Sequence, residues 1–158
     1  MSRLTPCLWF DGNAEEAARF YAATFPDSRV DKVTRAPGDY PAGQQGDVLT
    51  VEFTVLGMQF LGLNAGPGHP FTPAISFQAF TDDQAETDRL WAALTADGGR
   101  EMACSWCTDR FGVCWQVVPR RLPELLASPD AVVAGRVFKA MMGMVKIDIA
   151  AIEAAAKG

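Results

Sequence analysis

The sequence has 158 residues, 49% of them hydrophobic and 21% charged, which is typical of one globular domain with a sizeable core. The formal net charge is −5 at pH 7 and no basic stripe is present to neutralise phosphates, so we expect neither nucleic acid nor a membrane surface as a partner. No apolar run approaches the roughly twenty residues that span a membrane, and the first ten residues lack a signal-peptide pattern, which indicates a cytoplasmic protein.

The first predicted strand and helix occur twice in the chain. Segment 6–25, PCLWFDGNAEEAARFYAATF, aligns without a gap with segment 76–95, SFQAFTDDQAETDRLWAALT. Each copy has a short apolar strand, a polar turn and then the apolar spacing of an amphipathic helix. We expect Asn13 to cap the first helix, and Thr81 or Asp82 to cap the second.

The strands after each helix also match. Alternating apolar residues predict a strand at 47–55, which a turn at Gly57 joins to a second strand at 56–64. Segment 56–64 resembles segment 111–119, at the end of the second copy, and 27–35 is a candidate for the remaining strand of the first half. The sequence therefore predicts an α+β fold of paired βαβββ modules.

Residues 121–157 are predicted to form two or three short helices after the second module. Their apolar stripe has helical spacing and consists of Val132, Val133, Val137, Phe138, Met141 and Met142. The methionines of this stripe, together with Met144, are expected in the core or at a dimer surface. We expect a single domain over 1–158, with module one at 3–66, module two at 72–119 and this helical extension.

Each module has one helix, which covers one face of its sheet and leaves the other face to line a cleft or to meet solvent. Because side chains alternate along a strand, the polar residues on the uncovered faces can be named. They are Glu52, Gln59, Ser76, Gln78, Cys114 and Gln116. The same alternation puts Leu8 on the uncovered face, and Cys7, Ile75 and Phe77 on the helix side. A few polar groups in an apolar concavity favour a small-molecule site shared by the two modules.

The stretch CSWCTDRFGVCWQVVP, residues 104–119, contains a Cys104-x-x-Cys107 pair. A structural zinc site usually needs four such ligands, and only Cys7, Cys114 and His69 remain to complete one. A redox pair of this kind usually opens a helix, whereas this one precedes a strand. With no signal peptide, reduced thiols that pack in the structure are the favoured interpretation.

Four further residues border the predicted cleft. Trp106, in the loop before the last strand, is the tryptophan expected to cover a ligand. Asn64 ends its strand beside a glycine–proline connector, where it bonds either the backbone or a ligand. Asp109 is expected to cap a tight turn. His69 is expected to lie exposed in the connector, and a role as ligand or base at the cleft mouth stays open.

Several segments together resemble one known family. They are LTPCLWFDGNAEEAARFY, VEFTVLGMQFLGLNAGP, AISFQAF, DRFGVCWQVVP, LPELLASPD and VFKAMMGMVKIDIAAIEAA. In this order they resemble the PhnB-like branch, also called 3-demethylubiquinone 3-methyltransferase-like, of the vicinal oxygen chelate superfamily. That superfamily includes glyoxalase I, bleomycin- and fosfomycin-resistance proteins and extradiol dioxygenases. The resemblance covers nearly the whole chain and implies paired βαβββ modules in a homodimer.

The resemblance also implies where a divalent metal would bind. The matching positions here are Pro6, Leu61, Ala74 and Gln116, of which only Gln116 has a side chain that can ligate a metal. We therefore expect the usual metal site to be lost, and the sequence identifies no cofactor. The methyltransferase name lacks support as well, because no glycine-rich strand-to-helix turn for a nucleotide-like cofactor is present.

Three functional hypotheses follow. In the first, a cleft without the standard metal binds or converts a small metabolite: Gln116, Gln78 and Ser76 donate and accept hydrogen bonds, Trp106 stacks, and a buried Glu52 acts as general base. The second is a metal-dependent lyase or isomerase whose displaced metal is held by Glu52, Gln78 and Gln116. The third is a non-catalytic dimeric binding module that uses the C-terminal helices as its contact surface.

Overall fold

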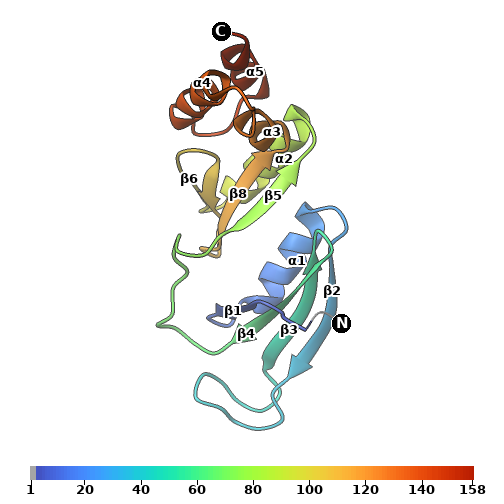
Figure 1. The fold of residues 1–158 in the computed structure, drawn as a ribbon. Coiled ribbons are helices and arrows are strands. Elements are labelled where there is room, and N and C mark those ends of the chain that lie inside the picture. The colour runs from blue at the N-terminus through green and yellow to red at the C-terminus, as the bar shows by residue number, and fades with distance from the viewer. Residues whose placement is uncertain (1–2) are drawn as a thin grey trace. The chain divides into compact units, whose positions relative to one another are not determined.

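The computed structural model describes residues 3–158. The chain divides after Phe71 into two compact units, which are described separately here. Figure 1 shows that each unit has its own sheet and its own covering helix. No helix among residues 3–158 is both long and apolar enough to cross a membrane.

The first unit contains module one. Its elements are β1 (Cys7–Phe10), α1 (Ala14–Thr24), β2 (Arg29–Arg35), β3 (Val48–Val55) and β4 (Met58–Asn64). The sheet order is β1-β4-β3-β2, with β1 parallel to β4 and the other pairs antiparallel. Helix α1 packs on this sheet, where the rings of Tyr21 and Phe53 lie 5.8 Å apart and both side chains are fully buried.

The second unit contains module two and the helical extension. The module consists of β5 (Phe77–Thr81), α2 (Gln84–Thr95), β6 (Arg100–Glu101), β7 (Trp106–Thr108) and β8 (Cys114–Pro119). Its sheet order, β5-β8-β7-β6, repeats that of the first unit. The predicted α+β fold of paired βαβββ modules is confirmed, including the strand expected within 27–35.

The predicted turn at Gly57 is confirmed by its backbone. Leu56 and Gly57 have φ angles of 49° and 77°, the left-handed conformation that tight two-residue hairpins require at both central positions. Gly112, the residue aligned with Gly57, also has a positive φ of 87°. The turns that start β4 and β8 are therefore encoded by glycine at matched positions.

The helix caps differ from the prediction. Asn13 is at the N-cap of α1 but makes no side-chain cap bond, and the backbone N–H of Ala14 donates instead to Oδ1 of Asn64 on β4, at 3.0 Å. Helix α2 is capped by Asp83, whose Oδ1 accepts from the backbone N–H of Glu86 at 2.8 Å. The predicted caps, Thr81 and Asp82, were wrong, because the N-cap is the residue directly before the first helical residue, Gln84.

The strand repeat is offset by one residue relative to the helix repeat. In the parallel pairs, Cys7 lies opposite Leu61, whereas Gln78 lies opposite Gln116. Because a shift of one residue turns every side chain to the other face, Leu8 is buried and Cys7 is exposed. The predicted faces of Leu8 and Cys7 were therefore wrong.

In the second module, Phe77 lies on the helix side as predicted, since its ring contacts that of Trp115 at 5.6 Å. The helix-side prediction for Ile75 was wrong, because Ile75 precedes β5 and is 73% exposed.

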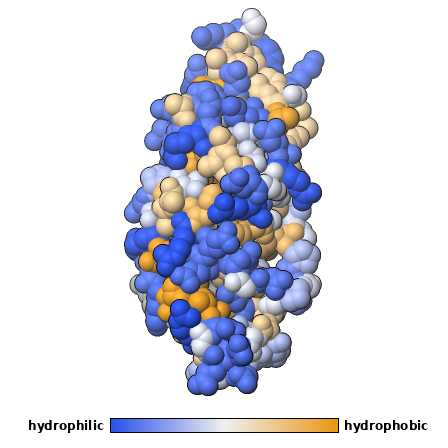
Figure 2. All heavy atoms as spheres, turned by 180° about the vertical axis from the view of Figure 1, so that it is seen from behind, coloured by the Kyte–Doolittle hydropathy of each residue, from blue (hydrophilic) through white to orange (hydrophobic). Residues whose placement is uncertain are grey.

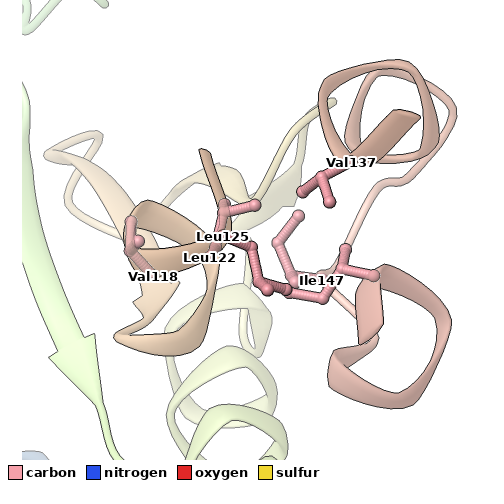
Figure 3. Packing of buried hydrophobic residues seen from close by; sticks show 6 residues of the cluster. Val118, Leu122, Leu125, Val137 and Ile147 are labelled. Atoms are coloured by element: carbon pink, nitrogen blue, oxygen red, sulfur yellow. The ribbon is translucent and has the colours of Figure 1, made fainter. Parts of the chain in front are cut away.

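The extension forms three helices, α3 (Arg121–Leu126), α4 (Ala131–Met142) and α5 (Ile149–Lys157). Figure 3 shows how they enclose a small core of their own that includes Leu122, Val137 and Ile147. Met141 and Met144 pack against this core, as predicted for the methionines. Only part of the predicted stripe is inside, because Val132, Phe138 and Met142 are more than half exposed.

Candidate ligand-binding site

A row of polar side chains lies on the sheet face of the second unit. Gln78 of β5 and Trp106 of β7 are the neighbours of Gln116 on the two strands flanking β8. Nε2 of Gln78 donates to Oε1 of Gln116 at 3.1 Å, and Nε2 of Gln116 donates to Oγ of Ser76 at 2.8 Å. The structure thus brings together four of the residues that the sequence placed in the site.

This row borders a groove of about 310 Å³. One side of the groove is formed by the sheet, through Gln78, Phe80, Trp106, Gln116 and Val118. The other side is formed by Cys104 and by the extension, through Leu122, Pro123, Leu126 and Met141. Trp106 lines the groove as predicted, although it begins β7 and does not lie in a loop.

Some groove residues escaped the sequence analysis. Phe80 could have been found, because it follows Gln78 by two positions on the same strand and so shares its face. It is 38% exposed, and the guanidinium of Arg120 lies 5.5 Å from its ring centre. Leu126 and Met141 could not have been found, since the alternation within strands says nothing about where the C-terminal helices fold back.

The turn before β7, residues 103–105, carries Cys104, which lines the groove. Cys104 and Ser105 have φ angles of 57° and 64°, a costly backbone conformation that persists only where the surroundings fix it. The backbone N–H of Cys104 donates to the carbonyl of Met144 at 2.9 Å, and that of Ser105 to the carbonyl of Val145 at 2.6 Å. This turn is therefore attached to the chain segment between α4 and α5.

The other cysteines of this unit are packed inside it. Cys107 is fully buried, and burial is the main cause that raises the pKa of its thiol to about 12. Cys114 is also buried and does not line the groove. Burial, followed by the charge of Asp109, raises the pKa of Cys114 above its ordinary value. All four cysteines of the chain have free thiols, and the buried Cys107 supports the packing interpretation of the Cys104–Cys107 pair.

Asp109 orients β8 from the opposite side of the sheet. Its carboxylate is buried, and Oδ1 accepts from the backbone N–H groups of Phe111 and Val113 at 2.9 and 3.0 Å. Its Oδ2 accepts from Nε1 of Trp115 at 2.8 Å. The predicted turn cap is confirmed, and because the anchored Trp115 points to the helix side, the next residue, Gln116, points to the groove.

The first unit has a groove of its own, of about 270 Å³. It is lined by Thr5, Asp31, Glu52, Phe53, Gln59, Phe60 and Leu61, so the two residues predicted for this module lie together. Glu52 is not buried as expected: its side chain is 43% exposed, with Nζ of Lys32 at 4.0 Å. The cause is that no element of this unit covers this face of the sheet, since α1 occupies the other one.

Asp31 is the residue of this groove that sequence reasoning missed. It lies at a register shift between Val30 and Lys32, where β2 departs from simple alternation. Its Oδ2 accepts from Oγ1 of Thr54 at 2.6 Å, and Oδ1 lies 2.7 Å from Nε of Arg29. A bulge leaves no mark in the hydrophobic pattern, so no signal in the sequence indicated this position.

Asn64 and His69 contact other parts of the protein itself. Asn64 is 4% exposed; besides capping α1, its Nδ2 donates to the carbonyl of Val48 at 2.9 Å. Of the two alternatives for Asn64, the structure shows the backbone one. His69 is exposed, as predicted, and its ring lies edge-on to that of Trp9 at 4.5 Å.

The residues at the superfamily's metal positions do not fit a divalent metal. Pro6, Leu61 and Ala74 offer no ligating side chain. Gln116, the fourth position, hydrogen-bonds Gln78 and Ser76 through both ends of its amide. Within residues 3–158, no three His, Cys, Asp or Glu side chains gather as a metal site.

Comparison with known proteins identifies the family. The model of the 3-demethylubiquinone-9 3-methyltransferase family matches residues 2–118. The PhnB protein of Bacillus cereus is similar in structure, with 29% sequence identity, a TM-score of 0.66, and coverage of 75% of this chain and 99% of that one. Protein PA1353 of Pseudomonas aeruginosa shares the fold, with 21% identity, a TM-score of 0.62, and coverage of 75% and 98%. No curated protein matches the sequence. The chain belongs to the 3-demethylubiquinone-9 3-methyltransferase family, the PhnB-like branch of the vicinal oxygen chelate superfamily.

Proposed function

We propose that the second unit binds a small molecule in the groove beside Gln116, without the metal that the superfamily usually holds there. The observation that carries the proposal is the hydrogen-bonded row of Gln78, Gln116 and Ser76 at the edge of an otherwise apolar groove. Small-molecule sites have this character, since apolar walls supply affinity and a few fixed polar groups set the orientation.

The composition of the groove favours a binding site over a solvated sheet face. The solvated face of an antiparallel sheet usually carries charged and small polar side chains. Here the neighbours of Gln116 include Trp106, Phe80 and Val118. A ligand that removes the exposed surface of Phe80 and Trp106 from water would lower the free energy of the complex.

Methyl transfer, the activity in the family's name, is not the function that we propose. That reaction needs a bound methyl donor as well as an acceptor. The groove of about 310 Å³ is near the lower end of small-molecule pockets, roughly 300–1,000 Å³. Its side chains offer hydrogen bonds and apolar contact for one small ligand.

A thermal-shift screen of small metabolites tests the proposal. A compound present at a hundred times its dissociation constant stabilises the protein by roughly 2.7 kcal/mol. We expect at least one compound whose effect is lost in Gln116→Leu and kept in Gln45→Leu, an exposed glutamine in the loop before β3. A screen without hits, or hits that survive Gln116→Leu, would contradict the proposal.

A separate proposal is that Glu52 acts as a general base on a substrate held in the groove of the first unit. The groove of the first unit supports it only in part, because Glu52 is accessible to a substrate but lacks the expected burial. Replacement of Glu52 by Gln removes a general base while preserving size. If Glu52 is the base, this variant should lose turnover of any substrate found; unchanged turnover would exclude the role.

Self-association is the second function for which we see a specific observation. Helix α4 exposes Val132, Phe138 and Met142 at 64, 53 and 55%. Figure 2 shows moderately hydrophobic residues on the surface of the C-terminal helices, at the top of the view. Exposed apolar patches of this kind often mark protein–protein interfaces, and we propose a second copy of the chain as the partner.

A further inference from the structure

We infer that the C-terminal extension forms a fixed wall of the groove and restricts it to uncharged, flat ligands that present a carboxamide or lactam edge to Gln116. This inference rests on the proposed small-molecule function and adds the ligand class. The family model matches residues 2–118, so α3 and α4, which form this wall, follow the matched segment.

The extension is anchored to module two on several sides. Ile147 and Leu122 are buried in a common core with Val118 of β8. On helix α2, Gln84 donates to the carbonyl of Ile147 at 3.2 Å and accepts from the backbone N–H of Ile149 at 2.9 Å. Together with the backbone bonds to the turn at Cys104, these contacts make the extension a permanent wall of the groove.

The groove contains no partner for a charged ligand. Of the ten described residues that line it, none is Asp, Glu, Lys, Arg or His. Arg120, whose guanidinium lies 5.5 Å from the ring centre of Phe80, is already paired with Asp82 at 2.9 Å. Moving an ion out of water into such a groove without a counter-charge is costly, so a neutral ligand is favoured over its ionised counterpart.

The polar edge matches an amide group. An amide side chain has two N–H donors and an oxygen that can accept two bonds. The bonds from Gln78 and to Ser76 use one donor and one acceptor site of Gln116. One donor and one acceptor site of Gln116 therefore remain, and a ligand that carries both a carbonyl and an N–H can use them.

The two walls favour a flat ligand. Trp106 and Phe80 line the groove from the sheet, and Leu126 and Met141 line it from α3 and α4. Aromatic side chains gain most from flat partners that they can stack on. A compound of one or two fused rings is consistent with the groove's volume of about 310 Å³.

The test uses two probes of matched size. Naphthalene-1-carboxamide is neutral and carries the amide edge, whereas 1-naphthoate has the same shape and is an anion at pH 7. We expect isothermal titration calorimetry on the full chain to show carboxamide binding, with the carboxylate at least about tenfold weaker. Equal affinity of the two probes would overturn the ligand class and leave the proposed site intact.

Variants of the extension test the wall. Met141→Trp and Leu126→Trp each fill the groove from the extension, and each should weaken carboxamide binding by about tenfold or more. Lys157→Trp, at the exposed end of α5, is the matched control and should bind as the wild type does. Circular dichroism shows whether each variant is folded.

The outcomes separate this inference from the proposed function. Loss of binding in Gln116→Leu with unchanged binding in both filling variants would overturn the wall while supporting the site. Absence of carboxamide binding would overturn the inference by itself. The proposed function fails only if the wider metabolite screen also yields no ligand that depends on Gln116.

Discussion

The orientation of Gln116 depends on a residue that touches no ligand. Asp109 accepts three hydrogen bonds inside the protein, one of them from the indole of Trp115. Because side chains alternate along β8, fixing Trp115 on the helix side fixes Gln116 on the groove side. The sequence predicted Asp109 as a turn cap, but its hydrogen bond to Trp115 could be identified only from the structure.

Replacement of Asp109 by Ala should destabilise the protein by about 3–5 kcal/mol, because the buried N–H groups of Val113 and Trp115 and the part-buried N–H of Phe111 lose their acceptor. Urea denaturation followed by circular dichroism measures this change. Asp82→Asn removes only the ion pair with Arg120, in which the side chain of Asp82 is 81% exposed. This substitution should cost less than about 0.5 kcal/mol. A similar effect of the two substitutions would contradict the role of Asp109.

The thiol of Cys107 predicts a pH effect. Burial raises its pKa to about 12 from 9.0, so above pH 9 the unfolded chain loses this proton while the folded chain keeps it. The stability contributed by the protonated thiol is therefore intact below pH 9 and declines as the pH rises toward 12. The free energy of unfolding of Cys107→Ala should fall less steeply over this window than that of the wild type.

A cavity control completes the measurement. Val117→Ala removes a fully buried side chain from the neighbouring strand and leaves the thiol in place. It should lower stability at every pH and keep the wild-type slope above pH 9. Equal slopes for all three proteins would show that Cys107 does not retain its proton.

At the scale of elements, the two modules differ in register where β1 and β5 pair with their partners. Matching Leu61 with Gln116 makes Cys7 the counterpart of Gln78, although the helices align one residue differently. Asn64, at the end of β4, joins α1 to β3 by bonding Ala14 and Val48. The first helix is therefore capped by a neighbouring strand and not by its own N-cap side chain.

Two asparagine variants should separate these roles. Asn64→Ala leaves a buried N–H and a carbonyl without partners and should cost about 2–3 kcal/mol. Asn13→Ala removes an N-cap side chain that makes no cap bond and should cost well under about 1 kcal/mol. Thermal unfolding of both variants measures the difference, and a larger loss for Asn13→Ala would contradict this arrangement of the cap.

Periodicity and turn residues were sufficient to predict the modules, because strand alternation, helical spacing and glycine turns are local properties. They also placed Ser76, Gln78, Trp106 and Gln116 in one site. The register of β1 could not be predicted, since it is set by pairing with a strand about fifty residues away. The groove wall formed by Leu126 and Met141 depends on tertiary packing of the extension, which local patterns do not encode.

At the scale of the whole molecule, the exposed apolar residues of α4 form the surface that we propose for self-association. Phe138 and Met142 of α4 are both more than half exposed. Contact of such large apolar side chains with water costs free energy, which a partner that covers them would recover. Gly135, on the same helix, has no heavy atom near the position of a Cβ, which leaves room for a close approach.

Light scattering at micromolar concentration tests the homodimer. We expect the wild type to have the mass of two chains and Phe138→Lys to have the mass of one, because a charge buried in an apolar interface is costly. Circular dichroism should show the same helix content in both proteins. A monomeric wild type would exclude a stable dimer.

Metal content is a second property of the whole molecule. Because the residues at the superfamily's metal positions do not fit a divalent ion, protein purified without chelators should contain less than about a tenth of an equivalent of any divalent metal. Elemental analysis measures this directly. A full equivalent that is reduced in a Gln78→Leu, Gln116→Leu double variant would instead support the displaced metal site.

The most direct test of the central claim follows the side-chain amides by NMR. The tightest compound from the metabolite screen is titrated into ¹⁵N-labelled protein, and the NH₂ signals of Gln78, Gln116 and Gln59 are recorded. Binding in the groove of the second unit predicts that the signals of Gln78 and Gln116 move and saturate together, along with the indole N–H of Trp106. Movement confined to Gln59, in the groove of the first unit, would contradict it.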